Sequence, residues 1–366
     1  MKNLIIQPGI MDIAPYSGGG SEIDGVKDII KLSSNESALG ASPMATACLE
    51  DIKHQLHRYP DSECTELRQT ISEIHNVNPM GVVCGSGSDE LISLICQVFA
   101  GPGNEIIYSQ YGFLMYPISA RAAGAVPVMA PESDRTADVD TLLAAVTRKT
   151  RILFLANPNN PTGTYISHKE IARLRNGLRD DILLVIDAAY SEYVERDDYC
   201  DGLNLVEHHE NVVMTRTFSK IYGLGGLRLG WAYCPKSVVD VLHRVRGPFN
   251  VNSIAQATGI AALKDEVFTK KVKNHNAKWL PWTRDRLLEF GLSVTESVGN
   301  FILCDFFNVD GKDAKSADKF LKQEGIIVRP MTSYGLPNSL RVTIGTESEM
   351  KTTVSAIGRF LERNQK

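Results

Sequence analysis

Residues 152–187 read ILFLANPNNPTGTYISHKEIARLRNGLRDDILLVID, two apolar runs separated by a polar turn and a helical stretch. The runs Ile152–Leu155 and Ile182–Asp187 are rich in branched aliphatic residues and have the length of buried strands. Between them, Ser167–Leu178 favours a helix that opens with Ser167-x-x-Glu170, the spacing of a capping box in which each side chain bonds the other residue's backbone N–H. Strand, helix and strand in this order predict a parallel pair with a crossover helix, and therefore an α/β fold.

The same alternation continues on both sides of this unit. Ser88–Phe99 favours another helix, and seven short β-rich runs predict a doubly wound, mostly parallel seven-stranded sheet. In such a sheet ligands bind at the carboxyl ends of the strands, so the residues that follow each strand are the candidates for function. The expected strands are Val82–Cys84, Glu105–Tyr108, Val126–Ala130, Ile152–Leu155, Ile182–Asp187, Val212–Thr215 and Leu229–Tyr233.

The pattern changes after the sheet. Val251–Phe290 is rich in helix formers, and the segment beyond it predicts a second, smaller α/β unit. The N-terminal segment is rich in Gly, Ser and Pro, which indicates an arm. We expect an N-terminal arm with part of the small domain (1–45), a large ligand-binding domain (46–275) and a small C-terminal domain (276–366). The small unit's expected strands are Ser297–Phe306, Gly325–Arg329 and Leu340–Ile344, and its expected helices are Ala317–Gln323 and Glu347–Arg363.

The composition excludes several classes of protein. The 366 residues are 43% apolar and 22% charged, an ordinary mixture that excludes a disordered chain, a collagen and a disulfide-rich miniprotein. The net charge of −4 argues against a polybasic nucleic-acid binder, and no apolar run approaches the roughly 20 residues that cross a bilayer. No signal peptide is recognisable, the seven cysteines contain no C-x-x-C pair, and the eight histidines have no metal-binding spacing. We expect a reduced, cytoplasmic protein that needs no metal and contacts neither nucleic acid nor membrane.

Two glycine- and asparagine-rich stretches follow predicted strands. Gly85–Glu90 permits a tight turn, and the helix start after it offers free N–H groups to an anion. An ordinary βα loop explains this stretch equally well, and Glu90 at the sixth position excludes the dinucleotide-binding glycine pattern. Asn157–Gly163 combines two prolines, a glycine and several Asn side chains, a density of hydrogen-bonding groups that a structural turn does not need.

The other two stretches carry a carboxylate and an amine. Asp187 closes an apolar strand, where a carboxylate needs a cationic partner or hydrogen-bond donors; a helix cap or turn is the alternative. Lys220 follows Thr217 and Ser219 and precedes a glycine-rich turn that ends at Arg228. Taken alone, it would be a surface lysine with an extended side chain. Beside hydroxyls, glycines and an arginine, we favour an amine held near a phosphate, with a lowered pKa and able to form a Schiff base.

Together these stretches indicate one ligand that carries four different groups. Lys220 suits an aldehyde, Asp187 a basic ring nitrogen, Asn160 and Tyr190 a ring hydroxyl, and the loop at Gly87 with Arg228 a phosphate. Pyridoxal 5′-phosphate carries all four groups, and it is the cofactor that we predict.

The order of the motifs resembles the fold-type I aminotransferases, and within them the histidinol-phosphate aminotransferase family. Asn-Pro-x-Asn-Pro-Thr-Gly, Asp-x-x-Tyr and Ser-Lys followed by Gly-Leu-x-Gly-x-Arg-x-Gly carry the resemblance, which extends from Ile13–Tyr16 to Leu340–Gly345. It implies a homodimer with shared active sites and a ping-pong transamination in histidine biosynthesis. The implied amino donor is L-histidinol phosphate and the implied acceptor is 2-oxoglutarate, with imidazole acetol phosphate and glutamate as products.

The resemblance also implies a role for each matching residue. Lys220 holds the cofactor and moves the substrate proton, Asp187 keeps the ring nitrogen protonated, and Tyr190 with Asn160 bonds the ring hydroxyl. Phe113 stacks on the ring. The phosphate is held by Gly87, Ser88, Thr217, Ser219 and Arg228, with Tyr59 reaching it from the partner subunit. The substrate side comprises Tyr16, Asn35, Arg329 near a substrate phosphate, and Arg341 on a carboxylate or its equivalent.

Two positions depart from the family's usual pattern. Asn35-Glu-Ser-Ala38 stands where Asn-Glu-Asn-Pro is common, and Asp187-Ala-Ala-Tyr190 where Asp-Glu-Ala-Tyr is common. Neither change removes a cofactor contact, but both reshape the pocket wall, so an aromatic aminotransferase stays open as an alternative. A non-catalytic, pyridoxal-phosphate-binding regulatory module is the alternative from another class. That alternative expects an added DNA-binding segment or a lost lysine, and this chain has neither.

Overall fold

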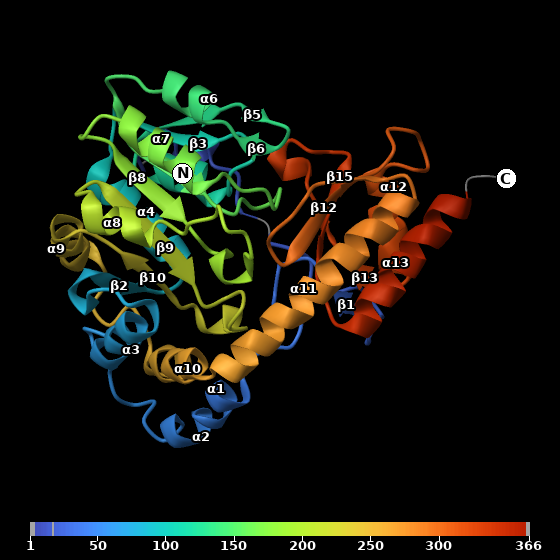
Figure 1. The fold of residues 1–366 in the computed structure, drawn as a ribbon, viewed down its shortest axis with the longest axis horizontal. Coiled ribbons are helices and arrows are strands. Elements are labelled where there is room, and N and C mark those ends of the chain that lie inside the picture. Colours follow the sequence, from blue (N-terminus) through green and yellow to red (C-terminus); the bar gives the residue numbers. More distant parts are fainter. Residues whose placement is uncertain (1–3, 17, 364–366) are drawn as a thin grey trace.

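The computed structural model describes residues 4–16 and 18–363. Its central feature is a sheet of seven strands in the order β2-β10-β9-β8-β7-β3-β4 (Figure 1). Neighbouring strands run parallel except at β10, which is antiparallel to both β2 and β9. The predicted α/β fold with a mostly parallel sheet is therefore confirmed. The strands are β2 (Val82–Gly85), β3 (Glu105–Ser109), β4 (Val126–Ala130), β7 (Thr150–Ala156), β8 (Leu183–Asp187), β9 (Val212–Thr217) and β10 (Gly230–Tyr233).

Helices cover both faces of this sheet, because side chains alternate along each strand between two apolar cores. Along β7, Leu153 and Leu155 belong to one core, whereas Ile152 and Phe154 belong to the other. The first core also contains residues of α3 (Thr65–His75), α6 (Val139–Ala144), α7 (His168–Gly177), α8 (Leu203–His208) and α10 (Ser253–Lys264). The second contains residues of α4 (Ser88–Phe99), α5 (Met115–Ala122) and α9 (Lys236–Val245).

A smaller unit is built on a second, four-stranded sheet in the order β11-β12-β15-β14 (Figure 1). The long helix α11 joins the two units, since Val272 lies in a core of the large unit and Trp279 in the core of the small one. The N-terminal segment contributes as well, because β1 pairs with β13. The domain boundaries given above stay predictions. The elements are β1 (Ile30–Lys31), α11 (Glu266–Glu289), β11 (Ser293–Val294), β12 (Phe301–Asp305), α12 (Ala314–Gln323), β13 (Ile326–Ile327), β14 (Arg329–Pro330), β15 (Ser339–Thr343) and α13 (Glu347–Glu362).

Two strand predictions for the small unit are wrong in part. Of the run 297–306, only Phe301–Asp305 is a strand; Gly299 lies in a bend against the Phe301 ring, where an added Cβ would stand 2.9 Å from a ring carbon. The run 325–329 is divided between two sheets, since β13 pairs with β1 and β14 pairs with β15. The sequence of a continuous apolar run does not indicate which strand each half of the run will pair with.

One of the two hydrogen bonds of the predicted capping box forms. The Ser167 hydroxyl accepts a hydrogen bond from the Glu170 N–H, but the Glu170 carboxylate binds Arg173 instead of the Ser167 backbone. Within the described ranges, none of the helices has the length and apolar character needed to cross a membrane. The short elements are α1 (Pro43–Ala47), α2 (Leu49–Ile52), β5 (Glu132–Ser133), β6 (Thr136–Ala137) and 3₁₀ turns at Ile10–Asp12, Pro79–Gly81, Ser191–Tyr193, Gly225–Leu227 and Thr332–Tyr334.

Candidate active site

A cavity of about 330 Å³ lies at the carboxyl ends of the central strands. Ala156, Asp187 and Thr217, the last residues of β7, β8 and β9, line it on one side, and Arg341 of β15 lines it from the small unit. The cavity brings together every predicted site residue except Gly87 and Tyr59, while the individual roles stay predictions. The predicted residues that line it are Tyr16, Asn35, Ser88, Phe113, Asn160, Asp187, Tyr190, Thr217, Ser219, Lys220, Arg228, Arg329 and Arg341.

Asp187 is a buried carboxylate held by two hydroxyl groups. The Tyr116 hydroxyl donates to Oδ2 at 2.7 Å, and the Thr215 hydroxyl donates to Oδ1 at 3.3 Å. Burial raises the pKa of Asp187 to about 6, because these neutral donors do not replace the water that would stabilise the charge. Sequence reasoning missed both donors. Tyr116 is the second residue of α5, three residues after Phe113, and Thr215 is the β9 residue in register with Asp187.

Lys220 follows β9 and reaches the N-terminal segment. Its Nζ donates a hydrogen bond to the Ser34 carbonyl at 3.2 Å and lies 5.7 Å from the centre of the Tyr190 ring. Burial lowers the pKa of Lys220 to about 8, with a further lowering from the positive charge of Arg341. About a tenth of the amine is therefore neutral, and nucleophilic, at pH 7, far more than for a lysine with the ordinary pKa.

Asn35 connects this amine's surroundings to the small unit. It occupies a left-handed backbone conformation with φ of 54°. Its Nδ2 donates to the Tyr190 hydroxyl at 2.9 Å, and its backbone N–H donates to the Thr343 hydroxyl at 2.9 Å. Burial raises the pKa of Tyr190 to about 12, so the phenol keeps its proton and stays a hydrogen-bond donor.

The start of α4 and the turn at Arg228 form one corner of the cavity. Gly87 has φ of 87°, and a Cβ there would stand 2.5 Å from Nη2 of Arg228, so the backbone and the guanidinium meet closely. Nη2 also donates to Asp89 at 3.1 Å, and Nη1 donates to the Gly225 carbonyl at 3.0 Å. The first N–H groups of a helix have no partner within it, so this corner suits an anion.

Arg341 is a buried cation whose hydrogen bonds fix its position. It donates to Oδ1 of Asn160 and, at 2.8 Å, to the Ser33 carbonyl. Burial lowers the pKa of Arg341, and its Nε–H has no acceptor among the described residues. A buried donor without a partner is costly, so an anionic ligand that accepts from this guanidinium would be stabilised.

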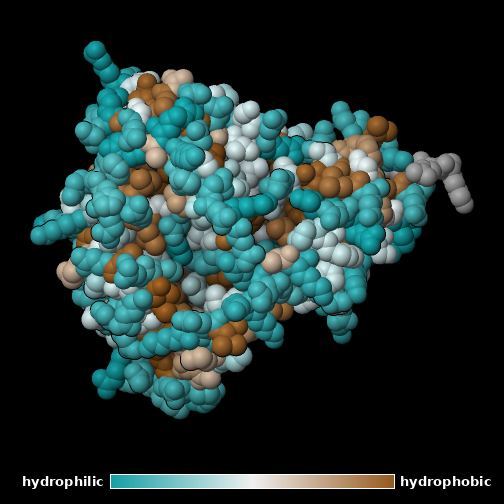
Figure 2. Space-filling view, viewed as in Figure 1, coloured by the Kyte–Doolittle hydropathy of each residue, from teal (hydrophilic) through white to brown (hydrophobic). Residues whose placement is uncertain are grey.

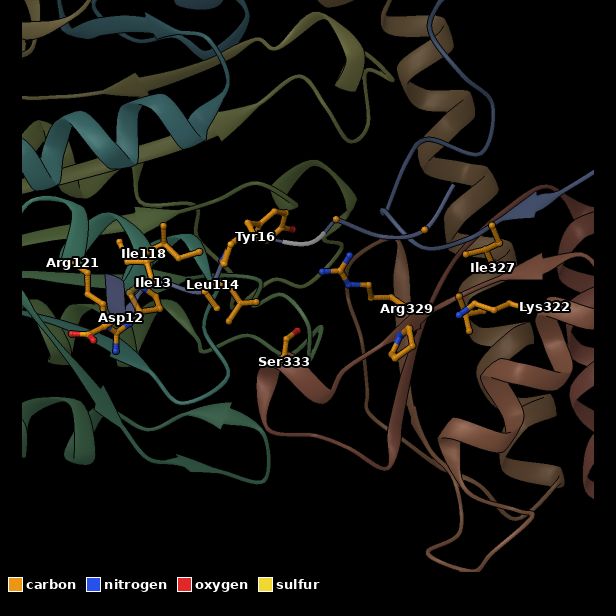
Figure 3. Close-up of a pocket in the computed structure, with 17 residues that line it drawn as sticks. Asp12, Ile13, Tyr16, Leu114, Ile118, Arg121, Lys322, Ile327, Arg329 and Ser333 are labelled. Atoms are coloured by element: carbon orange, nitrogen blue, oxygen red, sulfur yellow. The ribbon is translucent and has the colours of Figure 1, made fainter. Parts of the chain in front are cut away.

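A second cavity, of about 490 Å³, adjoins the first and shares Tyr16 and Arg329 with it (Figure 3). The Arg329 guanidinium lies 5.9 Å from the centre of the Tyr16 ring. Apolar side chains such as Leu114 form much of the lining, which also contains three cations, Arg121, Lys322 and Arg329, and a single carboxylate, Asp12. An elongated ligand with an anionic end would match this lining.

Tyr59 lies outside both cavities. The residue is 82% exposed, and its ring stacks on Phe249 with 4.6 Å between ring centroids. Its predicted approach to the cofactor phosphate of a partner subunit stays a prediction.

The residues present fit the predicted cofactor, pyridoxal phosphate. Among the described residues, Asp187 is a buried carboxylate that accepts side-chain hydrogen bonds from two hydroxyls and from no cation, which suits a protonated ring nitrogen. Lys220 offers an amine of lowered pKa to an aldehyde, and the corner at Gly87 and Arg228 suits a phosphate. Phe113 lines the same cavity and supplies an aromatic face.

Comparison with known proteins gives a consistent result. The sequence profile of the family Aminotransferase class I and II matches residues 27–357. A histidinol-phosphate aminotransferase of Paramagnetospirillum magneticum is 58% identical, with 97% of this chain and 98% of the relative aligned. A relative of that name from Rhodospirillum rubrum is 56% identical, with 97% and 96% aligned. The crystal structure of histidinol-phosphate aminotransferase from Sinorhizobium meliloti in complex with pyridoxal-5′-phosphate is 26% identical and covers 99% of this chain and 100% of its own, with a TM-score of 0.87.

Proposed function

The chain belongs to the histidinol-phosphate aminotransferase family of the class I and II aminotransferases, and on that premise we propose that it transfers the amino group of L-histidinol phosphate to 2-oxoglutarate. The products are imidazole acetol phosphate and glutamate. As a member of this family it is a pyridoxal-phosphate-dependent transaminase. The observation that carries the proposal is the meeting of Lys220, Asp187 and Arg341 in one cavity.

The reaction needs a base at the substrate Cα and a charge opposite the cofactor ring. When bound, pyridoxal phosphate supplies the aldehyde that takes up the amino group and a protonated ring that draws electrons from Cα. We propose that Lys220 would hold the cofactor through its amine and, when that amine is free, would act as the base that takes the proton from the substrate Cα and the acid that passes it to C4′. Asp187 would keep the ring nitrogen protonated through its negative charge, and Tyr190 with Asn160 would hold the ring hydroxyl.

Two buried arginines account for binding of anionic substrates. Arg341 would bind a carboxylate of 2-oxoglutarate, because its guanidinium is fixed by Asn160 and Ser33 and retains a free donor at Nε among the described contacts. Arg329 lies between the two cavities beside Tyr16, where it would bind the phosphate of histidinol phosphate. A planar guanidinium binds both kinds of anion through paired hydrogen bonds.

We propose further that the enzyme is a cytoplasmic homodimer with shared active sites. Exposed apolar side chains gather on the α1–α2 segment and near it, at Met44, Leu49 and Leu56. Figure 2 shows apolar patches over the part of the molecule where α1 and α10 lie. A second copy covering this surface would bring Tyr59, which lies in the same region of the chain, towards the other subunit's phosphate corner.

Aromatic transamination is the second candidate. The apolar part of the second cavity, with Leu114 and Ile118, favours it, since an aromatic side chain would pack there. Against it, phenylalanine has no phosphate group, whereas the same lining contains the cations Arg121, Lys322 and Arg329, which suit a phosphate.

The test is a visible spectrum of the purified holoenzyme, followed by addition of histidinol phosphate, phenylalanine and glutamate one at a time. Histidinol phosphate should abolish the absorbance of the lysine-bound cofactor at lower concentration than phenylalanine. Glutamate should do the same, as the product of the second half-reaction. The same response to phenylalanine at equal or lower concentration would favour the aromatic enzyme. A bound cofactor that no donor consumes would favour the regulatory module.

A further inference from the structure

Tyr116 is fully buried and fixed on several sides. Its ring stacks on Phe154 with centroids 4.6 Å apart and planes 3° from parallel, and it meets the Phe113 ring edge-on at 5.9 Å. Its hydroxyl donates to Oδ2 of Asp187 at 2.7 Å. The short bond and the packed ring leave the phenol little freedom, so its position determines where Oδ2 can lie.

The two oxygens of Asp187 are held unequally. Oδ2 accepts a short bond from Tyr116, whereas Oδ1 accepts a longer one, of 3.3 Å, from Thr215. A carboxylate oxygen can accept more than one hydrogen bond, and Oδ1 has the weaker existing partner. Oδ1 is therefore the oxygen better able to accept a further, charged donor.

We propose that Tyr116 is a positioning residue for the cofactor ring: by holding Oδ2 of Asp187 it presents Oδ1 to the pyridine nitrogen and keeps the proton on that nitrogen. The inference rests on the proposed function in one respect, that pyridoxal phosphate occupies the cavity with its ring nitrogen at Asp187. Through its edge contact with Phe113, Tyr116 also links the carboxylate to the aromatic residue that faces the same cavity.

The hydrogen bond from Tyr116 lowers the pKa of Asp187, whereas burial and a neighbouring charge raise it. Burial raises the pKa of Asp187, the Asp89 carboxylate on α4 raises it further, and the Tyr116 hydroxyl opposes both by stabilising the ionised form. Lys220 and Tyr190 line the same cavity from the segments after β9 and β8. Removing the Tyr116 hydroxyl would raise the pKa of Asp187. Its carboxyl group would then compete with the ring nitrogen for the proton.

The experiment uses holoenzyme reconstituted with pyridoxal phosphate labelled with ¹⁵N in the ring, and measures its solid-state ¹⁵N signal between pH 6 and pH 9. Wild type should keep the signal of a protonated nitrogen. Tyr116→Phe should move it towards the unprotonated value and weaken cofactor binding about tenfold, the change expected from one pKa unit. Tyr108→Phe is the matched control, because Tyr108 lies on β3 in the same core and outside both cavities. It should leave the signal and the affinity unchanged.

A second substitution guards against misfolding of the first. Replacing Tyr116 by 3-fluorotyrosine keeps the ring and makes the phenol a stronger donor, so the nitrogen should hold its proton to higher pH than in wild type. An unchanged ¹⁵N signal in both Tyr116 variants would overturn the proposal. Borohydride reduction and peptide mapping distinguish failure of the Tyr116 role from failure of the proposed function. An adduct at Lys220 with unchanged ¹⁵N signals refutes only the role of Tyr116. Absence of the adduct in wild type refutes the proposed function as well.

Discussion

The Nζ of Lys220 donates a hydrogen bond to the carbonyl oxygen of Ser34, which joins the end of β9 to the N-terminal segment across 186 residues of chain. Burial and the charge of Arg341 together bring the pKa of Lys220 from 10.5 to about 8. The reactivity of this amine is thus set by three separate parts of the fold, namely the large unit, the small unit and the N-terminal segment.

The first prediction concerns the pH at which the cofactor attaches. Only the neutral amine attacks an aldehyde, so the rate at which apoenzyme binds pyridoxal phosphate covalently should rise with pH, with its midpoint at about 8. Stopped-flow measurement of the lysine-bound absorbance between pH 6 and 10 gives the midpoint. Arg341→Ala should move the midpoint to higher pH, and Arg341→Lys, which keeps a positive charge, should move it less. A midpoint near 10 in wild type would show that Lys220 is not desolvated as described.

The second prediction is that Asp187→Asn stabilises the apoenzyme while it disables the holoenzyme. The pKa of Asp187 is raised in the fold, from 3.8 to about 6, so its ionisation costs folding free energy. That cost is absent below pH 3.8, grows as the pH rises to about 6, and is complete above it. About two pKa units correspond to about 3 kcal/mol. Denaturant titrations of the apoenzyme should show this gain at pH 7.5 and lose it towards pH 4.

The same Asp187→Asn variant should remove the Cα proton of histidinol phosphate about a hundredfold to a thousandfold more slowly, because the negative charge opposite the ring is lost. Rapid-mixing absorbance of the first half-reaction measures this rate. Asp24→Asn, at an exposed position, is the control for both measurements. Equal stability of wild-type and Asp187→Asn apoenzymes at pH 7.5 would contradict the burial cost.

The main architecture could be predicted because it is encoded locally. Each of the seven strands is a short apolar run, and a run such as Ile182–Asp187 is recognisable without its neighbours. The motif residues also follow strands, and the carboxyl ends of parallel strands meet at one edge of the sheet. Asp187 and Lys220 could therefore be assigned to one site from their order along the chain.

Pairings between distant segments could not be predicted in this way. The run 325–329 looks like one strand, and only β1, near the N-terminus, shows that Ile326–Ile327 belongs to a different sheet from Arg329. Tyr116 was likewise missed as a partner of Asp187, because nothing in its own helix indicates a carboxylate 71 residues further along. Side-chain hydrogen bonds of this kind depend on the tertiary arrangement and leave no periodic signal.

The third prediction separates the two buried arginines. Arg329→Gln should lower kcat/KM for histidinol phosphate about tenfold to hundredfold, the usual effect of losing a charged hydrogen bond, and should change that for unphosphorylated histidinol much less. Arg341→Gln should instead raise KM for 2-oxoglutarate. Steady-state kinetics with both donors and the acceptor give these values. If Arg329→Gln keeps the wild-type preference for the phosphorylated donor, the phosphate is bound elsewhere.

The fourth prediction concerns Tyr59, whose exposed ring lies outside its own cavity. If Tyr59 completes the site of a second subunit, two defective chains should complement each other. Lys220→Ala removes the amine from the site of its own subunit. Tyr59→Ala weakens phosphate binding in the site of the partner subunit, so in a mixed dimer both defects fall on one site. In a mixed dimer, the site with an intact Lys220 receives its Tyr59 from the Lys220→Ala chain, so one complete site is restored.

Coexpression of the two variants with different affinity tags, followed by purification on both tags, isolates this mixed dimer. It should bind pyridoxal phosphate at one site per dimer with wild-type affinity, whereas the pure Tyr59→Ala dimer should bind it more weakly at both sites. A mixed dimer of Lys220→Ala with Phe249→Ala is the control for loss of the ring stacking itself, because Phe249 contacts Tyr59 within one chain. If the Lys220→Ala and Tyr59→Ala mixture binds the cofactor no better than the pure Tyr59→Ala dimer, Tyr59 acts within its own subunit and the shared site is refuted. Restored affinity has no other source, since the only intact Tyr59 in that dimer belongs to the chain whose own lysine is missing.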